Sequence, residues 1–206
     1  RDRINTSLEK RLLHLEVTSL LYGEKNEVTL DTHHGLGWDY FLAGQYSKAH
    51  QHFEFALRGW LEKGELFTED LEILVNHRVF TLKGLVQCCI KLGKLDKAKA
   101  CCLVAINLLE KGKLTEYGAY YEELLNLITI NLEKGNTDES CRLLNSIQPI
   151  PDIATHVVGR NYLLGELALY YLAVHQYEDA LTATYRLKNA KYFAKMKLQP
   201  AVALEI

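Results

Sequence analysis

Apolar side chains recur three and four residues apart through most of the chain, as in Ala49, Phe53 and Ala56. This spacing places them on one face of an α-helix. A sustained apolar–polar alternation, which would indicate strands, is not found. We therefore predict an all-α protein with helices over residues 6–22, 26–43, 47–63, 69–92, 96–111, 116–134, 138–147, 153–174, 177–187 and 190–198.

A short turn motif occurs four times, at residues 43–49, 92–98, 134–140 and 174–180. Each copy has two polar residues and then a small residue, and the first three also have a glycine, which His175 replaces in the last. Glycine ends a helix easily because it accepts the left-handed conformation without steric penalty. The small residue lets the following helix approach the preceding one closely. The motif therefore predicts helix–turn–helix hairpins, with Ser47, Asp96, Asp138 and Glu178 as helix caps or first-turn acids.

This pattern resembles the tetratricopeptide repeat family over roughly residues 25–190. Copies near Val79, Tyr121 and Asn161 match less well, and Asn131 and Thr184 depart from the family pattern. The resemblance implies a right-handed α-solenoid of about four to five antiparallel hairpins. The clearest copy, residues 30–63, has family-preferred residues at Leu36, Gly37, Tyr40, Ala49, Phe53 and Ala56.

The small residues Ala49, Ala98, Ser140 and Ala180 are separated by 49, 42 and 40 residues. The usual repeat has about 34 residues, so these are long repeats. Their architecture resembles the helical sensor regions of bacterial regulators. Two segments, Glu62–Leu66 and Glu110–Leu114, each place a glycine stop after the second helix of a hairpin.

We expect one solenoid fragment over residues 1–206, cut from a longer protein. Residues 1–24 form a preceding helix or cap, and residues 189–206 begin a further hairpin or form a cap. The hairpins themselves are expected at residues 25–67, 68–114, 115–151 and 152–188.

Composition narrows the possible functions. The chain has 24 Lys and Arg against 26 Asp and Glu, a formal charge of −2, so it lacks the basic excess typical of nucleic-acid binding. Its hydrophobic content of 48% and its three prolines argue against disorder. The five cysteines include two adjacent pairs, a poor disulfide framework, so we expect reduced cysteines and a cytoplasmic location.

Catalytic and metal motifs are missing from the sequence. There is no phosphate loop, no Gly-x-Ser-x-Gly and no His-Glu-x-x-His. His33, His34, His50 and His52 share one predicted hairpin. Their spacing places them on different faces of their helices, so they do not form a set of metal ligands. We predict no enzymatic activity, no bound metal and no cofactor.

The resemblance also implies a binding groove lined by the first helix of each hairpin. Its positions fall at His34, Trp38, Phe41, Phe80, Lys83, Gln87, Glu122, Thr129 and Tyr162, with Ile90, Leu125, Leu169 and Leu172 beside them. Alternatively, some of these side chains pack against the next repeat. One subtype grips a peptide carboxylate with Lys and Asn, but this chain has His34, Trp38 and Gly84 at those places, so that mode is not expected.

We therefore predict a non-enzymatic scaffold that binds a protein or peptide segment, such as a helix, in an apolar and aromatic groove. The alternative is a ligand- or peptide-responsive sensor domain of a larger bacterial signalling or transcription-control protein. A third reading is a purely structural role, as a spacer or dimerisation segment whose groove is filled by its own chain. Self-association through exposed ends of the solenoid is a further expectation, and neither a nucleic acid nor a membrane is an expected partner of this segment.

Overall fold

The computed structural model describes residues 2–115 and 118–146, together with residues 168, 169, 171, 172, 178 and 180. Helices and short turns account for this described part of the chain, and no strand occurs in it. The chain divides into two compact units, residues 1–114 and 115–206, and each is described by itself. The division falls between the second and third predicted hairpins, and the expectation of a single stack stays a prediction.

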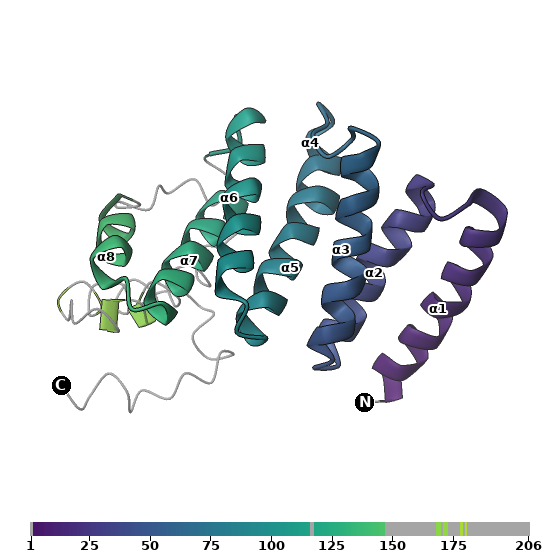
Figure 1. The fold of residues 1–206 in the computed structure, drawn as a ribbon, viewed down its shortest axis with the longest axis horizontal. Coiled ribbons are helices and arrows are strands. Elements are labelled where there is room, and N and C mark those ends of the chain that lie inside the picture. The colour runs from purple at the N-terminus through teal and green to yellow at the C-terminus, as the bar shows by residue number, and fades with distance from the viewer. Residues whose placement is uncertain are drawn as a thin grey trace, which may run out of the picture. The chain divides into compact units, whose positions relative to one another are not determined.

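The first unit contains antiparallel helices that follow one another side by side (Figure 1). Helix α1 packs against α2, and α3 packs against both α2 and α5. Most boundaries match the predicted ones within one residue, and α1 begins four residues earlier than predicted. The helices are α1 (Asp2–Tyr22), α2 (Glu27–Leu42), α3 (Tyr46–Glu62), α4 (Leu71–Ile73), α5 (Phe80–Lys91) and α6 (Leu95–Lys111).

A π-helical segment, Leu74–Val79, joins α4 to α5. The sequence predicts one uninterrupted helix over residues 69–92, and this is wrong in the middle of that range. The helix also begins at Leu71, two residues later than the predicted start at residue 69. Asp70 is its cap, because the Asp70 carboxylate accepts hydrogen bonds from the backbone N–H of Glu72 at 3.0 Å and of Ile73 at 3.1 Å.

The hairpin turns have the predicted glycines. Gly44, Gly93 and Gly135 have φ angles of 74°, 70° and 76°, a region that side chains other than glycine rarely adopt. The small residues that follow, Ala49, Ala98 and Ser140, are completely buried. The repeated motif therefore forms the same helix–turn–helix junction in all three copies that the structure describes.

Two details of the predicted helix ends are wrong. Ser47 is not a cap, because α3 begins at Tyr46 and its N-cap residue, Gln45, makes no capping hydrogen bond through its side chain. Gly112 does follow the end of α6, as predicted, but the left-handed conformation lies at Lys113, with φ of 55°, and not at Gly112, with φ of −74°. Asp96 does lie in the first turn of α6, where an acid is favoured by the helix dipole.

Phe53 of α3 fills the space between α2 and α5. A Cβ atom at Gly37 of α2 or at Gly84 of α5 would come within 2.4 Å of the Phe53 ring. Two glycines inside helices are normally unfavourable. Here they allow the helices to close on a completely buried aromatic ring.

The second unit begins with α7 (Gly118–Glu133) and α8 (Thr137–Ser146). Ser140 Oγ donates to the backbone carbonyl of Ile128 at 3.3 Å, so the polar small residue of this copy is bonded across its hairpin. Residues 168, 169, 171, 172, 178 and 180 are helical, at positions inside the predicted helices 153–174 and 177–187. The predicted helix 190–198 lies outside the described residues.

Candidate functional site

Aromatic side chains from α2, α3 and α5 form one cluster. The Trp38 ring lies 4.6 Å from the Phe80 ring, 5.3 Å from Phe53 and 5.6 Å from Phe41, measured between centroids. The His34 ring lies 6.3 Å from Phe80. His34, Trp38 and Phe41 are four and three residues apart, which puts them on one face of α2. We call His34, Trp38, Phe41, Phe53 and Phe80 the aromatic cluster.

The aromatic cluster is buried on one side and open on the other. Phe53 is completely buried, Trp38 and Phe41 are half-buried, and Phe80 keeps 40% of its surface exposed. The Lys83 ammonium lies 5.3 Å from the centroid of the Phe80 ring, a favourable cation–π arrangement. The open side of the cluster therefore combines an aromatic ring with a positive charge.

The structure brings five of the nine predicted groove residues together. These are His34, Trp38, Phe41, Phe80 and Lys83, all in the first unit.

The remaining four lie elsewhere. Gln87 is half-buried further along α5. Glu122 and Thr129 are half-buried on α7 in the second unit, and Thr129 Oγ1 donates to the Leu125 carbonyl at 3.0 Å. Leu125 itself is buried, so it belongs to the packing of that unit. Tyr162 lies outside the described residues.

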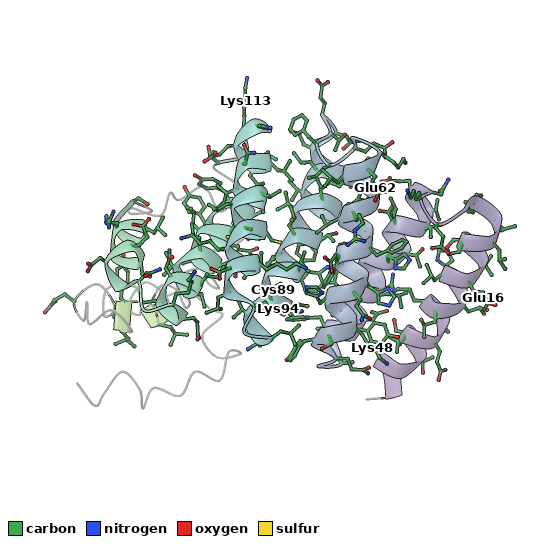
Figure 2. All side chains as sticks on the ribbon, viewed as in Figure 1. Glu16, Lys48, Glu62, Cys89, Lys94 and Lys113 are labelled. Carbon is green, nitrogen blue, oxygen red and sulfur yellow. The ribbon has the colours of Figure 1, made fainter. Side chains whose placement is uncertain are left out.

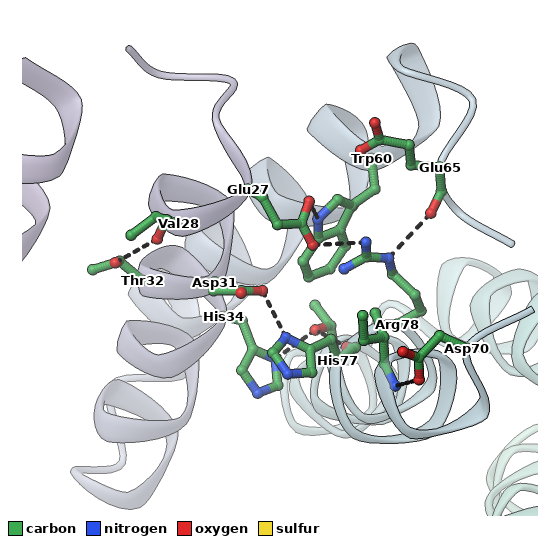
Figure 3. A network of polar contacts seen from close by, with 12 residues as sticks. Glu27, Val28, Asp31, Thr32, His34, Trp60, Glu65, Asp70, His77 and Arg78 are labelled. Atoms are coloured by element: carbon green, nitrogen blue, oxygen red, sulfur yellow. Dashed lines mark hydrogen bonds and ion pairs between the residues drawn. The ribbon is translucent and has the colours of Figure 1, made fainter. Parts of the chain in front are cut away.

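A second feature, which the sequence did not predict, is a buried polar network centred on Arg78 (Figure 3). Arg78 is only 3% exposed. Its Nη2 donates to Glu27 Oε1 at 2.8 Å, and its Nε donates to the Glu65 backbone carbonyl at 3.1 Å. The guanidinium carbon lies 3.9 Å from the centroid of the Trp60 ring, and Trp60 Nε1 donates to Glu27 Oε2 at 3.1 Å. One carboxylate thus joins α2, α3 and the π-helical segment.

A surface depression of about 380 Å³ borders this network. Its charged side chains are two acids and two bases, so their formal charges cancel and it offers no net charge to an ionic ligand. Its lining consists of Glu27, Lys63, Gly64, Glu65, Phe67, Thr68, Ile73 and Arg78.

Histidines connect the network to the aromatic cluster. His77 Nδ1 lies 2.6 Å from Asp31 Oδ1, and the His77 ring stacks on His34 with 5.8 Å between centroids. The Thr81 hydroxyl donates to the His77 carbonyl. Since its one hydrogen is used there, Thr81 must accept from His34 Nδ1, 2.5 Å away. His34 therefore has its hydrogen on Nδ1.

Burial lowers the pKa values of the clustered histidines. It lowers the pKa of His34 to about 4, helped by the charges of His77, Arg11 and Arg78. Burial, with a contribution from His52, also lowers the pKa of His33 to about 4. Nδ1 of His33 lies only 2.9 Å from Nδ1 of His52, so the pair shares one hydrogen. These side chains are neutral at pH 7 and act as hydrogen-bonding and stacking groups.

The sequence contained one signal for the Arg78 network. Arg78 is a charged residue between the apolar positions Leu74, Val75 and Val79, and a buried arginine needs an acidic partner. Nothing in the apolar pattern indicated the π-helical segment that directs Arg78 towards Glu27.

Metal binding and thiol chemistry find little support in the described residues. They contain no group of three or more His, Cys, Asp and Glu side chains that could hold a metal ion. Cys88, Cys89, Cys101 and Cys102 carry reduced thiols that form no disulfide. Burial raises the pKa of the Cys88 thiol to about 12 and also raises that of Cys89, so both are poor nucleophiles. No helix of the described part is long and apolar enough to cross a bilayer.

No family model and no curated protein matches the sequence. Solved structures do match it, and the three described here are each 16% identical to this chain. Two structures of a kinesin light chain candidate from Podosopora anserina, with nearly identical TPR-like repeats, give TM-scores of 0.74 and 0.72. The first match covers 93% of this chain and 88% of that one, and the second covers 95% and 90%.

BtubC from P. vanneervenii gives a TM-score of 0.71, with 90% of this chain and 72% of that chain covered. At this identity the likeness concerns the fold. The resemblance to bacterial regulator sensor regions stays a prediction. The helices, the repeated turn and these matches together confirm that the chain has an all-α, tetratricopeptide-like helical-repeat solenoid fold.

Proposed function

We propose that the chain is a non-enzymatic scaffold that binds a segment of another protein on the open side of the aromatic cluster. The observation that carries this proposal is Phe80, which stays 40% exposed beside Trp38 and beneath the Lys83 ammonium. Aromatic side chains in such a setting are frequent anchors of protein interfaces, because they offer apolar area with little conformational entropy to lose.

The chemistry of the surface defines its partner. Phe80 and Trp38 suit an apolar side chain, and Lys83 suits a carboxylate close to it. A short segment with one apolar anchor and one neighbouring acid, in a helix or an extended strand, matches both groups. The neutral state of His34 at pH 7 keeps the floor of the surface uncharged.

The same observations favour binding over catalysis. His33 and His52 are bonded to each other, His34 is bonded to Thr81, and the buried Cys88 thiol is not activated. We infer a protein partner, no cofactor, and a reducing, cytoplasmic setting suited to free cysteines.

A displayed peptide library selected on the folded protein tests the proposal. Peptides that bind the parent chain are then measured by calorimetry against Phe80→Ala and against Phe55→Ala. Phe55 is a matched control, since it is 38% exposed but lies on α3 and stacks on His33.

We expect Phe80→Ala to weaken binding by about tenfold or more, the usual loss at an interface hot spot. Phe55→Ala should leave the affinity unchanged. Selected peptides should carry an acid beside an apolar residue. Equal loss in both variants, or none in either, would show that the partner binds elsewhere.

A further inference from the structure

Helix α1 exposes a stripe of large apolar side chains. Leu13, Leu20 and Leu21 are 62%, 79% and 68% exposed, and Val17 is 44% exposed. Their spacing of three and four residues places them on one face of the helix. We call these four residues the α1 stripe. A continuous apolar face of this kind on a soluble protein usually marks an interaction site.

The α1 stripe is not the face that attaches α1 to the rest of the unit. That attachment uses Arg11, whose Nε lies 2.7 Å from Asp39 Oδ2, and His14, whose Nδ1 lies 3.1 Å from Thr32 Oγ1. Thr18, on the same side, is buried. Figure 2 shows Glu16 on the side of α1 that is turned away from α2.

We propose that the α1 stripe is a self-association surface, on which a second copy of this chain packs its own α1 in the antiparallel direction. The stripe has the symmetry that such a contact requires. Leu13, Val17 and Leu21 are evenly spaced at four residues. A two-fold axis at Val17 therefore sets each Leu13 against Leu21 of the second copy and Val17 against its counterpart, which is an isologous contact.

The charges at the two ends of the stripe select the antiparallel direction. Lys10 lies seven residues before Val17, and Glu24 lies seven residues after it, just beyond the end of α1. Both are exposed. In the antiparallel pairing each Lys10 meets Glu24 of the second copy, whereas a parallel pairing would bring like charges together.

This dimer is a weak one. The 21 residues of α1 correspond to a helix about 31 Å long, and a single helix pair buries less area than a standard stable interface. The two Glu16 carboxylates also approach the two-fold axis from one flank and repel each other. We therefore expect a dissociation constant of the order of micromolar, measurable by varying protein concentration.

Analytical ultracentrifugation of the full chain tests this proposal from about 1 µM to about 500 µM, the range that spans such a constant. The average mass should rise with concentration from the monomer value of 23.6 kDa towards twice that value. Val17→Glu and Leu20→Glu should stay monomeric throughout, because each places a charge in the apolar contact. Leu61→Glu is the matched control, since Leu61 is 63% exposed on α3, and it should dimerise like the parent.

A charge swap tests the direction of pairing. Lys10→Glu alone should weaken the dimer several-fold, and adding Glu24→Lys should restore it. Circular dichroism and the urea midpoint check that each variant is folded.

A parent chain that is monomeric at every concentration overturns the proposal. A dimer that survives both Val17→Glu and Leu20→Glu also overturns it, because association then uses another face. If the double charge swap fails to restore the dimer, the antiparallel pairing is wrong.

Discussion

Acidification should destabilise the first unit through His33 and His34. Both are held neutral in the folded chain, with pKa values of about 4, because burial disfavours their charged forms. In the unfolded chain their pKa returns to about 6.5. Between these two values the unfolded chain binds protons that the folded chain does not. The free energy of unfolding therefore falls as the pH falls from about 6.5 towards about 4.

The size of the effect follows from these values. Between about pH 7.5 and about pH 5, each of the two histidines lowers the free energy of unfolding by about 2 kcal/mol, so the pair removes about 4 kcal/mol. That is a large part of the 5–15 kcal/mol, roughly, that stabilises an ordinary domain. Above about pH 7.5 the same histidines are neutral in both states and contribute no pH dependence.

The free energy of unfolding is measured by urea titration with tryptophan fluorescence at five pH values. They run from about 5 to about 7.5, the range in which the two histidines titrate in the unfolded chain. Trp38 and Trp60 both lie in the first unit, so the signal reports the unit that contains the two histidines. The comparison is between the parent chain and a His33→Gln, His34→Gln double variant. The double variant should lose about 4 kcal/mol of the parent's pH dependence, and each single variant about half of it.

The difference in pH dependence between the double variant and the parent chain reports the contribution of His33 and His34. Asp31, whose pKa burial raises, works in the opposite direction, because the folded chain takes up its proton more readily as the pH falls. Its contribution is common to both proteins. If the double variant keeps the parent's slope between about pH 5 and about pH 6.5, the burial of charge at these positions is not the cause.

Two further predictions concern packing. Glu27→Ala should lower the free energy of unfolding by about 3–5 kcal/mol in urea titrations at pH 7, because it leaves the buried Arg78 without its carboxylate; a loss no greater than that of an exposed Glu→Ala change would contradict this. Gly84→Ala should cost about 1–3 kcal/mol, since its Cβ would press into the Phe53 ring. Gly118→Ala, at a helical position with open space around it, is the control and should be neutral or stabilising. If both substitutions change the free energy of unfolding equally, the Phe53 ring can move away from the new Cβ without destabilising the protein.

Much of this fold could be predicted from the sequence because its hairpins depend on local features. A glycine at the turn and a small residue after it suffice to place Gly44 with Ala49 and Gly93 with Ala98. Helix periods then locate α2, α3 and α6 within one residue at each end.

The open side of the aromatic cluster was partly predictable for the same reason. His34, Trp38 and Phe41 share a face of α2 by spacing alone. That Phe80 and Lys83 of α5 lie beside them followed from the family resemblance, and no periodicity could have shown it. Binding at this surface and the alternative of a sensor domain both stay predictions.

What could not be predicted depends on contacts between distant residues. No residue type marks the π-helical segment in the sequence, and its His77 and Arg78 bond Asp31 and Glu27 of α2, which lie far away along the chain. The left-handed conformation at Lys113, next to an available glycine, is likewise a property of the packed helix end. In the sequence, Gly84 is only a departure from a peptide-binding pattern. Its role in making room for the Phe53 ring depends on the packing of α3 against α5.

The π-helical segment also limits how far the repeats are interchangeable. A π-helix takes in more residues per turn than an α-helix, so the face that α5 presents is out of phase with that of α4. A consensus hairpin built with regular α-helical turns, grafted in place of the second hairpin, would rotate His77 and Arg78 away from Asp31 and Glu27. The first two hairpins are therefore a matched pair, and modular designs that extend this chain should duplicate them together.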